Sequence, residues 1–359
     1  MCGDVDITYI TPAEDGFYDI ATPQQMLWWA HYTAKKNLGA KGRLTQDIDM
    51  QGIDNYPIIG EETAPFYGCF DGQYHVISNL IINYPDKNGV GFISYINSVP
   101  ADAEHKDADR TDEEHASYIR NLTLDESCKV IGQAYVGGIL GGTSAWQGLV
   151  KVQNCVVRCG VYALNGANAG GIHGVCMGST CAIAVDNCGV TSTIRCKKEG
   201  GVISGWMGSY GTLTNCWSIS NVYEEGDGVN MDADPDAAKR VDNFVRYSST
   251  NKLQTANNWW LYKQDQVVTN TFKMDIVPTG ELAWVLNNKQ FKEPIWYQRI
   301  GDDEVPFLDK RRGVVAKLYD NYYSIYNDES LAEAIEAVKH TNEEYIGSMA
   351  YKGVREELE

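Results

Sequence analysis

The tetrapeptide Ile119-Arg120-Asn121-Leu122 decides the fold, because its pattern recurs along the chain. The pattern is an aliphatic residue, any residue, Asn, and then Leu or Cys. The other copies are Ile77-Ser78-Asn79-Leu80, Val152-Gln153-Asn154-Cys155, Val185-Asp186-Asn187-Cys188 and Leu213-Thr214-Asn215-Cys216. Successive asparagines are 42, 33, 33 and 28 residues apart, and periods in this range indicate a repeat architecture.

A second pattern, Gly-Gly-Ile-x-Gly, lies between these copies. It appears at Gly137–Gly141 and Gly170–Gly174, with degenerate forms at Gly89–Ile93 and Gly200–Gly205. Two patterns that stay in step along the chain indicate a repeating coil.

The Asn of each copy marks a change in the direction of the chain. In a strand, side chains alternate between two faces, so the apolar positions should keep one parity. Here the apolar residue lies two positions before Asn121, at Ile119, but one and three positions after it, at Leu122 and Leu124. Asn tolerates the left-handed backbone conformation that such a corner needs. We expect the Asn amides of successive coils to form a stacked ladder, and the glycines to form a second corner where a Cβ would not fit.

These features predict an all-β fold, a right-handed parallel β-helix. The amphipathic helices of tetratricopeptide and ankyrin repeats are missing from the sequence between residues 70 and 222, whereas short strands in units of about 30 residues fit β-helix coils. Cys155, Cys188 and Cys216 take the inward position that Leu122 holds. We interpret them as a buried stack of free thiols, with disulfides as the alternative.

The two ends of a solenoid need caps. Thr22-Pro23 predicts the start of an amphipathic helix over residues 22–36 that caps the N-terminal end. Trp28 and Trp29 are assigned to the core of this cap, with a ligand site as the alternative. An acidic stretch from Pro100 to Ser117 predicts a solvated insertion loop.

The predicted organisation has four parts. They are a lead at 1–14, a capped β-helix at 15–222, a mixed region at 223–328, and a C-terminal helix at 329–359. The last helix is predicted from apolar residues at roughly helical spacing.

The acidic composition narrows the classes of partner. The chain has 48 acidic and 30 basic residues, a formal net charge of −18, and such a surface repels phosphate backbones and anionic lipids. We therefore expect no nucleic-acid partner. No apolar run is long enough to cross a bilayer. Cys2 lies where mature bacterial lipoproteins carry an acylated Cys, so it is a candidate lipid anchor and the one expected membrane contact; an arbitrary N-terminus is the alternative.

Several segments together resemble one family. They are Asp15–Ile20 leading into Thr22-Pro23, Leu44–Met50, Pro57–Gly60, Phe66–Leu80 and the Gly-Gly-Ile-x-Gly units. Over roughly residues 13–222 the chain resembles the GLUG-repeat β-helix proteins of gut Bacteroides-type bacteria. This resemblance implies a secreted or outer-membrane-anchored surface protein, often adhesin-like or linked to glycan use. It does not define an activity.

Parallel β-helices also include polysaccharide lyases and glycoside hydrolases, so catalysis is the alternative function. Glycoside hydrolysis needs two carboxylates about 5–10 Å apart. The position before the corner Asn carries a single acid among Ser78, Arg120, Gln153, Asp186 and Thr214. His173 lies in a glycine repeat where another copy has Leu140, which favours a buried or edge histidine over a catalytic one. We assign no catalytic residue.

We expect a non-catalytic surface protein that binds a glycan, or a host or outer-membrane protein. Trp146, Trp206 and Tyr210 follow the glycine anchors in predicted loops, and Trp217 follows the last Asn corner. Aromatic rings on a β-helix face suit sugar stacking, so these four are the candidate ligand-binding residues. The alternative is that each ring covers a neighbouring coil.

Two further expectations concern the C-terminal half. Asp232, Asp234 and Asp236 carry alternate carboxylates that resemble part of a calcium loop, which makes calcium the candidate cofactor and an ordinary acidic loop the alternative. A third candidate function is an accessory scaffold of an outer-membrane uptake complex, docked through the helix at 329–359.

Overall fold

The computed structural model describes residues 8–98, 116–143, 148–176, 181–208, 210–225, 239–241, 244–247, 252–260, 282–288, 294–298, 303–310, 314–318 and 321–325. The chain divides into two units. The first contains residues 1–258 and 264–273, and the second contains residues 259–263 and 274–359. The predicted lead up to Ile7, most of the insertion at 100–117 and the helix at 329–359 lie outside the described residues.

Most of the described secondary structure consists of short strands. In the first unit the elements are β1 (Phe17–Ile20), α1 (Pro23–Lys35), β2 (Lys41–Leu44), β3 (Ile48–Asp49), β4 (Cys69–Ser78), β5 (Ile81–Val90), β6 (Ile93–Ile96), β7 (Ser117–Leu124), β8 (Lys129–Gly137), β9 (Leu140–Thr143), β10 (Gly148–Val157), β11 (Gly160–Ala167), β12 (Ala169–Gly170), β13 (His173–Cys176), β14 (Cys181–Asp186), β15 (Gly189–Val190), β16 (Thr193–Lys198), β17 (Ser204–Met207), β18 (Tyr210–Thr214), β19 (Trp217–Ser218), β20 (Asn221–Glu224), β21 (Lys239–Val241), β22 (Val245–Tyr247) and β23 (Lys252–Ala256). In the second unit they are β24 (Trp259–Trp260), α2 (Leu282–Leu286), β25 (Val314–Leu318) and β26 (Asn321–Ile325).

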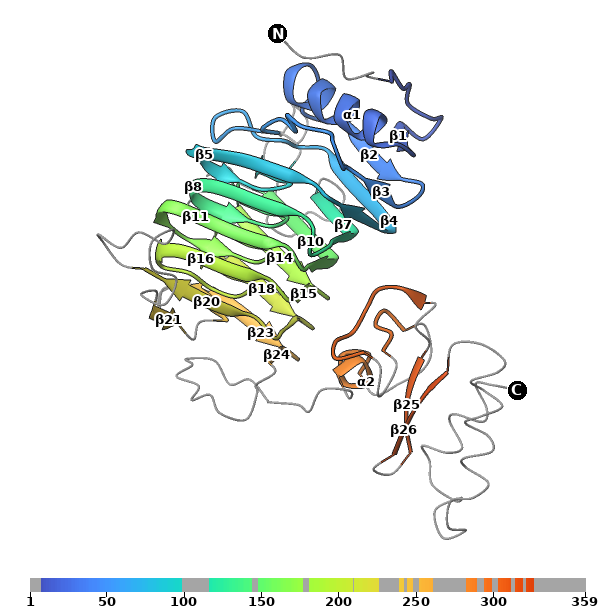
Figure 1. The fold of residues 1–359 in the computed structure, drawn as a ribbon, viewed down its shortest axis with the longest axis vertical. Helices are drawn as coiled ribbons and strands as arrows, with labels where there is room; N and C mark the ends of the chain where they lie inside the picture. The colour runs from blue at the N-terminus through green and yellow to red at the C-terminus, as the bar shows by residue number, and fades with distance from the viewer. Residues whose placement is uncertain are drawn as a thin grey trace. The chain divides into compact units, whose positions relative to one another are not determined.

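The strands of the first unit wind into a parallel β-helix with three sheets (Figure 1). Each coil passes through the three sheets in the same order: β7, β8 and β9 are followed by β10, β11 and β13. Sheet 1 runs β1-β2-β4-β7-β10-β14-β18-β23, sheet 2 contains β5, β8, β11, β16 and β20, and sheet 3 runs β6-β9-β13-β17-β22. Neighbours such as β7, β10 and β14 pair in parallel, so the predicted β-helix is confirmed.

The first corner of the coil is built on asparagine, as the sequence predicted. The strand register stacks five asparagines at this corner, and all have a left-handed backbone with φ between 50° and 54°. They are Asn121, Asn154, Asn187, Asn215 and Asn257. A non-glycine residue with this conformation is uncommon, and Asn adopts it at the lowest cost. The residue type therefore fixes where each coil turns.

The predicted amide ladder is present, but aspartates interrupt it. The Asn154 Nδ2 donates to the Asn121 Oδ1 at 2.8 Å, and the Asn257 Nδ2 donates to the Asn215 Oδ1 at 2.8 Å. Between these pairs, the amides of Asn187 and Asn215 both donate to Asp186, at 3.0 and 3.1 Å. Along the ladder, some asparagine amides therefore donate to the next asparagine and others donate to an aspartate carboxylate.

One copy of the pattern was assigned to the wrong corner. The register pairs Asp71 with Arg120, and β4 then bulges at Gln73 and Tyr74, both with positive φ. Asn79 therefore does not align with Asn121; it lies in the turn between β4 and β5, with a left-handed φ of 55° of its own. Two extra residues in β4 caused the shift. They directly follow Asp71-Gly72, where the Gln73 amide donates to the Asp71 Oδ1 at 2.9 Å, and a glycine within a strand is a common mark of a bulge.

The glycine-rich second corner works mainly through close approach. A Cβ added to Gly170 would lie 2.2 Å from the His173 carbonyl oxygen, which confirms that no side chain fits there. The left-handed residues of this corner are instead Tyr135, Asn168 and Glu199, with φ of 58°, 65° and 67°.

The predicted cysteine column lies in the core. Cys155, Cys188 and Cys216 are fully buried and free. Each Sγ lies 3.3 Å from the carbonyl oxygen two residues before it. The thiols therefore pack in the core and hydrogen-bond to the backbone. The prediction of free, inward-facing thiols is confirmed.

Helix α1 caps the first coil. Thr22 is its N-cap and accepts a hydrogen bond from the Gln25 amide, and Pro23 occupies the first helical position. Trp29 is fully buried and packs against Phe66 and Phe70, as predicted. Trp28 is only partly buried and stacks on Tyr32 with ring centroids 5.0 Å apart.

The coils continue beyond residue 222, where we expected them to end. Strand β23 pairs in parallel with β18, and Asn257 takes the next corner. In the second unit, the Asn287 side chain accepts from the backbone amides of Ile295 and Trp296 after helix α2, and β25 pairs antiparallel with β26. Among the described residues, no helix has the length and apolarity needed to span a membrane.

Candidate functional site

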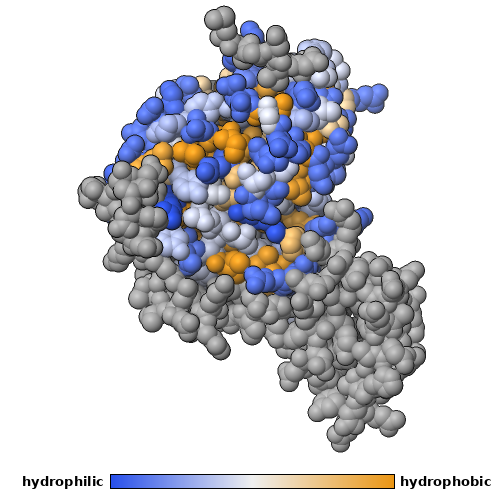
Figure 2. Space-filling model, viewed as in Figure 1, coloured by the Kyte–Doolittle hydropathy of each residue, from blue (hydrophilic) through white to orange (hydrophobic). Residues whose placement is uncertain are grey.

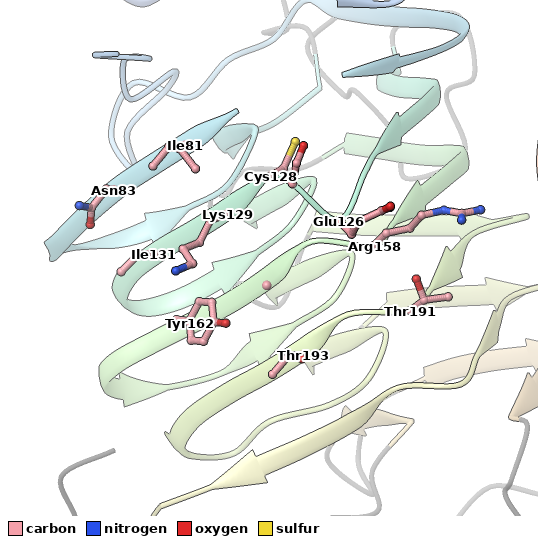
Figure 3. Close-up of a pocket in the computed structure, with 12 residues that line it drawn as sticks. Ile81, Asn83, Glu126, Cys128, Lys129, Ile131, Arg158, Tyr162, Thr191 and Thr193 are labelled. Atoms are coloured by element: carbon pink, nitrogen blue, oxygen red, sulfur yellow. The ribbon is translucent and has the colours of Figure 1, made fainter. Parts of the chain in front are cut away.

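A groove lies on the outer face of sheet 2, across β5, β8, β11 and β16 (Figure 3). It has a volume of about 630 Å³ and is partly open to solvent; its lining residues are Ile81, Asn83, Glu126, Ser127, Cys128, Lys129, Ile131, Arg158, Gly160, Tyr162, Thr191 and Thr193. Its floor consists of two outward-facing rows of side chains that the strand register stacks from coil to coil. One row runs through Ile81, Lys129, Gly160 and Thr193, and the other through Asn83, Ile131 and Tyr162.

A longer turn in one coil forms the rim of this groove. Lys129 follows its corner asparagine by eight residues, whereas Gly160 and Thr193 follow theirs by six. The two extra residues belong to the turn at 125–128. In it the Asp125 Oδ1 accepts the Ser127 amide at 2.9 Å, the Asx-turn bond that Asp favours. The Ser127 Oγ accepts the Asn79 amide at 2.6 Å, so the rim is fixed to the preceding coil.

Tyr162 provides an aromatic surface in the floor. A Cβ added to Gly160 would lie 2.5 Å from the Tyr162 Cε2, so the ring edge extends over Gly160 and needs a glycine beneath it. The ring remains partly exposed. The Lys129 Nζ lies 5.4 Å from its centroid, within range of a cation–π interaction. Figure 3 shows the Lys129 side chain directed toward the ring.

The other lining groups are polar at the rim and mixed along the floor. Glu126, Ser127 and Thr193 are exposed, and Arg158 and Thr191 are half-buried. Cys128 is buried, and this burial raises the pKa of its thiol to about 12. It therefore stays a neutral thiol near neutral pH and is not an activated nucleophile.

Among the described residues, the lining of the groove has no carboxylate pair of the kind a glycoside hydrolase uses. Glu126 is the one acid among the residues that line it. On sheet 1, the corrected register places a second acid, Asp71, in the column that contains Asp186. These two are three coils apart, about 14 Å at the usual strand spacing, which exceeds the working range of such a pair. Asp71 is also ion-paired with Arg120 at 2.8 Å.

The described members of the predicted row of ligand-binding aromatics do not form one exposed row. Trp217 is fully buried, and its ring fills the space over Gly189 in the preceding coil, where an added Cβ would lie 2.4 Å from it; its assignment to a ligand face is wrong. Trp206 lies in strand β17 rather than in a loop, with the Arg246 guanidinium 5.2 Å from its ring centroid.

Tyr210 begins strand β18 rather than lying in a loop, and it packs against the cluster of Ala116, Leu149 and Ala182. Both this ring and that of Trp217 thus cover neighbouring coils, which was the alternative interpretation. Trp146 lies outside the described residues.

The remaining candidate residues fall in two groups. Asp232, Asp234 and Asp236 and the candidate anchor Cys2 lie outside the described residues. Within the described ranges, no group of three or more His, Cys, Asp or Glu side chains is placed to hold a metal. His173 is fully buried, with its Nδ1 2.9 Å from the Ser204 Oγ, as expected for a structural histidine.

Tyr162 and Lys129 were missed by reasoning from the sequence. The signal was present: each of the strands β8, β11 and β16 begins at a nearly fixed distance from its corner asparagine and alternates outward and buried residues. Aligning those outward positions places Lys129 beside Gly160 and Tyr162 beside Ile131. The longer turn at 125–128 hides this alignment unless two residues are skipped.

Comparison with known proteins does not identify a family. No protein-family model matches the chain, and no curated protein matches it. A solved structure that resembles it is that of a "putative immunoglobulin A1 protease" from Bacteroides ovatus, with a TM-score of 0.44 and 18% sequence identity, covering 82% of this chain and 93% of that chain. A similarity at this level does not transfer an activity, so function has to be argued from the groove.

Proposed function

We propose that this chain is a non-catalytic β-helix protein that binds a glycan in the Tyr162 groove. The observation that carries the proposal is the partly exposed Tyr162 ring over Gly160, in the floor of a groove of about 630 Å³. Sites for small ligands combine apolar or aromatic surface with a few polar groups that fix orientation. Here hydroxyl, amide, carboxylate and ammonium groups line the same groove.

The outer surface supports a ligand with both apolar and polar faces. Figure 2, viewed from the same side as Figure 1, shows hydrophobic residues in separate patches among hydrophilic ones over the coils. A saccharide has apolar ring faces and hydroxyl edges, so it matches such a mixed surface better than a purely apolar ligand does. The repeated strands extend this surface along the axis, which suits a linear chain of sugar units.

The proposal keeps the setting that the sequence resemblance implies. We propose that the chain is one of the GLUG-repeat β-helix proteins and acts, adhesin-like, at the outer surface of a bacterial cell. Labelling of intact cells with a membrane-impermeant amine reagent should modify the protein; protection equal to that of a cytoplasmic marker would contradict this location.

The binding function is tested with a glycan array followed by calorimetry on each hit. Wild-type protein should bind at least one glycan, and Tyr162→Ala should weaken binding tenfold or more, about 1.4 kcal/mol. Tyr118→Ala is the matched control, because Tyr118 also faces outward with a cation, Arg120, 4.6 Å from its ring centroid, but lies on sheet 1 away from the groove. Binding that is equal in wild type and Tyr162→Ala would overturn the proposal. Shortened or unsaturated products from a bound glycan would overturn its non-catalytic part.

A further inference from the structure

We propose that the groove selects anionic glycans, that is, saccharides with carboxylate or sulfate groups, and that Lys129 binds the anion while Tyr162 stacks on the sugar ring. This inference rests on the proposed function and assigns it a ligand class.

Within the described residues, no carboxylate neutralises the charge of Lys129. Among the described residues its recorded interaction is the one with the Tyr162 ring, and no carboxylate lies within ion-pair distance of its Nζ. Its side chain is exposed at the groove floor. The chain as a whole carries 18 more negative than positive charges, so an ammonium group with no carboxylate partner among the described residues is unusual for this composition.

Further basic side chains lie on the groove wall and along the outer face of sheet 2. Arg158 lines the groove, and Arg195 and Lys197 follow on strand β16 in the next coil. Carboxylates farther along sheet 2 have partners of their own: Glu224 accepts the Gly200 amide at 2.9 Å, and Glu199 pairs with Arg246 at 2.8 Å. Glu126 at the rim is the one acid that lines the groove. Beyond about 8–10 Å charges are largely screened at physiological ionic strength, so an anion at Lys129 interacts mainly with the charged groups that line the groove.

The geometry places the two contacts a sugar unit apart. Lys129 is the register partner of Gly160, the residue over which the Tyr162 ring extends. The Nζ-to-centroid distance of 5.4 Å lets a pyranose stack on the ring while the flexible lysine stem brings its ammonium to an exocyclic carboxylate or sulfate. Asn83 and Thr193 lie in the same floor and offer hydrogen bonds to hydroxyl groups.

The inference is tested with an array that pairs each uronate or sulfated oligosaccharide with its methyl-esterified or desulfated counterpart. Full-length wild-type protein should bind the charged member at least tenfold more tightly, with affinity that falls as NaCl is raised from 50 to 300 mM. Lys129→Met should reduce this preference to about threefold or less. Lys41→Met is the matched control and should keep the preference, because the Lys41 Nζ also lies 5.8 Å from a ring centroid, that of Phe17, but on sheet 1 outside the groove.

The outcomes separate the two proposals. Tyr162-dependent binding that is equal for charged and neutral members, or a preference that survives Lys129→Met, would overturn the anionic selectivity and leave glycan binding standing. No binding to any glycan would overturn the proposed function, and this inference with it. Equal binding of a single-stranded oligonucleotide would show a general polyanion surface and would also overturn it.

Discussion

Replacing Asn121 should reveal what the asparagine corner contributes to the fold. Asn121 holds a φ of 54°, its amide donates to the Asp71 carboxylate at 2.9 Å, and its Oδ1 accepts from Asn154 at 2.8 Å. In Asn121→Ala the bond to the carboxylate is worth about 1.5–3 kcal/mol and the amide–amide bond about 0.5–1.5 kcal/mol. The left-handed backbone costs a non-glycine residue a further 1 kcal/mol, roughly. Since the site is half-buried, we expect a total loss of about 3–5 kcal/mol.

Asn121→Gly separates the two causes. It loses the same hydrogen bonds but accepts the left-handed backbone without strain, so it should be about 1 kcal/mol more stable than Asn121→Ala. Native-state hydrogen exchange, read by mass spectrometry on peptides from β7 and β10, gives the free energy of opening of these coils. A loss below about 1 kcal/mol in Asn121→Ala, or a glycine variant no more stable than the alanine variant, would refute the corner mechanism.

Three other predictions concern the core. Burial lowers the pKa of His173 to about 4, whereas an unfolded histidine binds a proton below about pH 6.5. The wild type should therefore lose up to about 3 kcal/mol of its unfolding free energy as the pH falls from 6.5 to 4, and His173→Leu should lose less. Equal losses for the two proteins, measured by urea unfolding, would contradict this. Burial also holds the pKa of the Cys188 thiol well above its ordinary value. Iodoacetamide at pH 8 should therefore modify the less buried Cys69 before Cys188. The reverse order, followed by mass spectrometry, would refute the burial of the cysteine column. Gly170→Ala should lower the free energy of unfolding by more than about 3 kcal/mol, because its Cβ would lie 2.2 Å from a carbonyl oxygen. Gly52→Ala is the control: Gly52 has a φ of 76° and open space around it, so this variant should lose about 1–2 kcal/mol. Similar thermal midpoints for the two variants would contradict the close-approach account.

The parts of the fold that the sequence predicted correctly have a residue type tied to a backbone state or to burial. Asn121 and Asn154 mark left-handed corners because few other residues tolerate that conformation. Thr22-Pro23 marks the start of α1 because a hydroxyl cap and a missing amide suit that position. Cys188 is predicted to be buried once its position directly after the corner asparagine is known.

The parts that were missed depend on register between distant segments. The bulge at Gln73 and Tyr74 moves Asn79 to another corner. Gly72 before it is compatible with a bulge, but the two-residue shift follows only from the pairing of β4 with β7. The coil with Asn257 at its corner has Thr255 and Asn258 where earlier coils have apolar residues. The repeated aliphatic-x-Asn-Leu/Cys pattern is therefore absent from its sequence.

The candidate site was missed for the same reason. An aromatic residue after a corner indicates an exposed ring only if the coil below has a side chain to hold it away. Gly189 has none, so the Trp217 ring packs over it and is fully buried. Gly160 likewise accepts the Tyr162 ring, but the groove formed by the turn at 125–128 leaves that ring partly exposed. Such a difference depends on loop lengths in two neighbouring coils, which a single motif does not record.

The most direct test of the groove is a crystal structure of the full chain with an oligosaccharide that binds it in solution. We predict a sugar ring stacked on Tyr162, with contacts to the floor formed by Lys129 and Thr193. A saccharide bound at another surface, for example beside Trp206 or Tyr210, with the groove on sheet 2 free of it, would contradict the account.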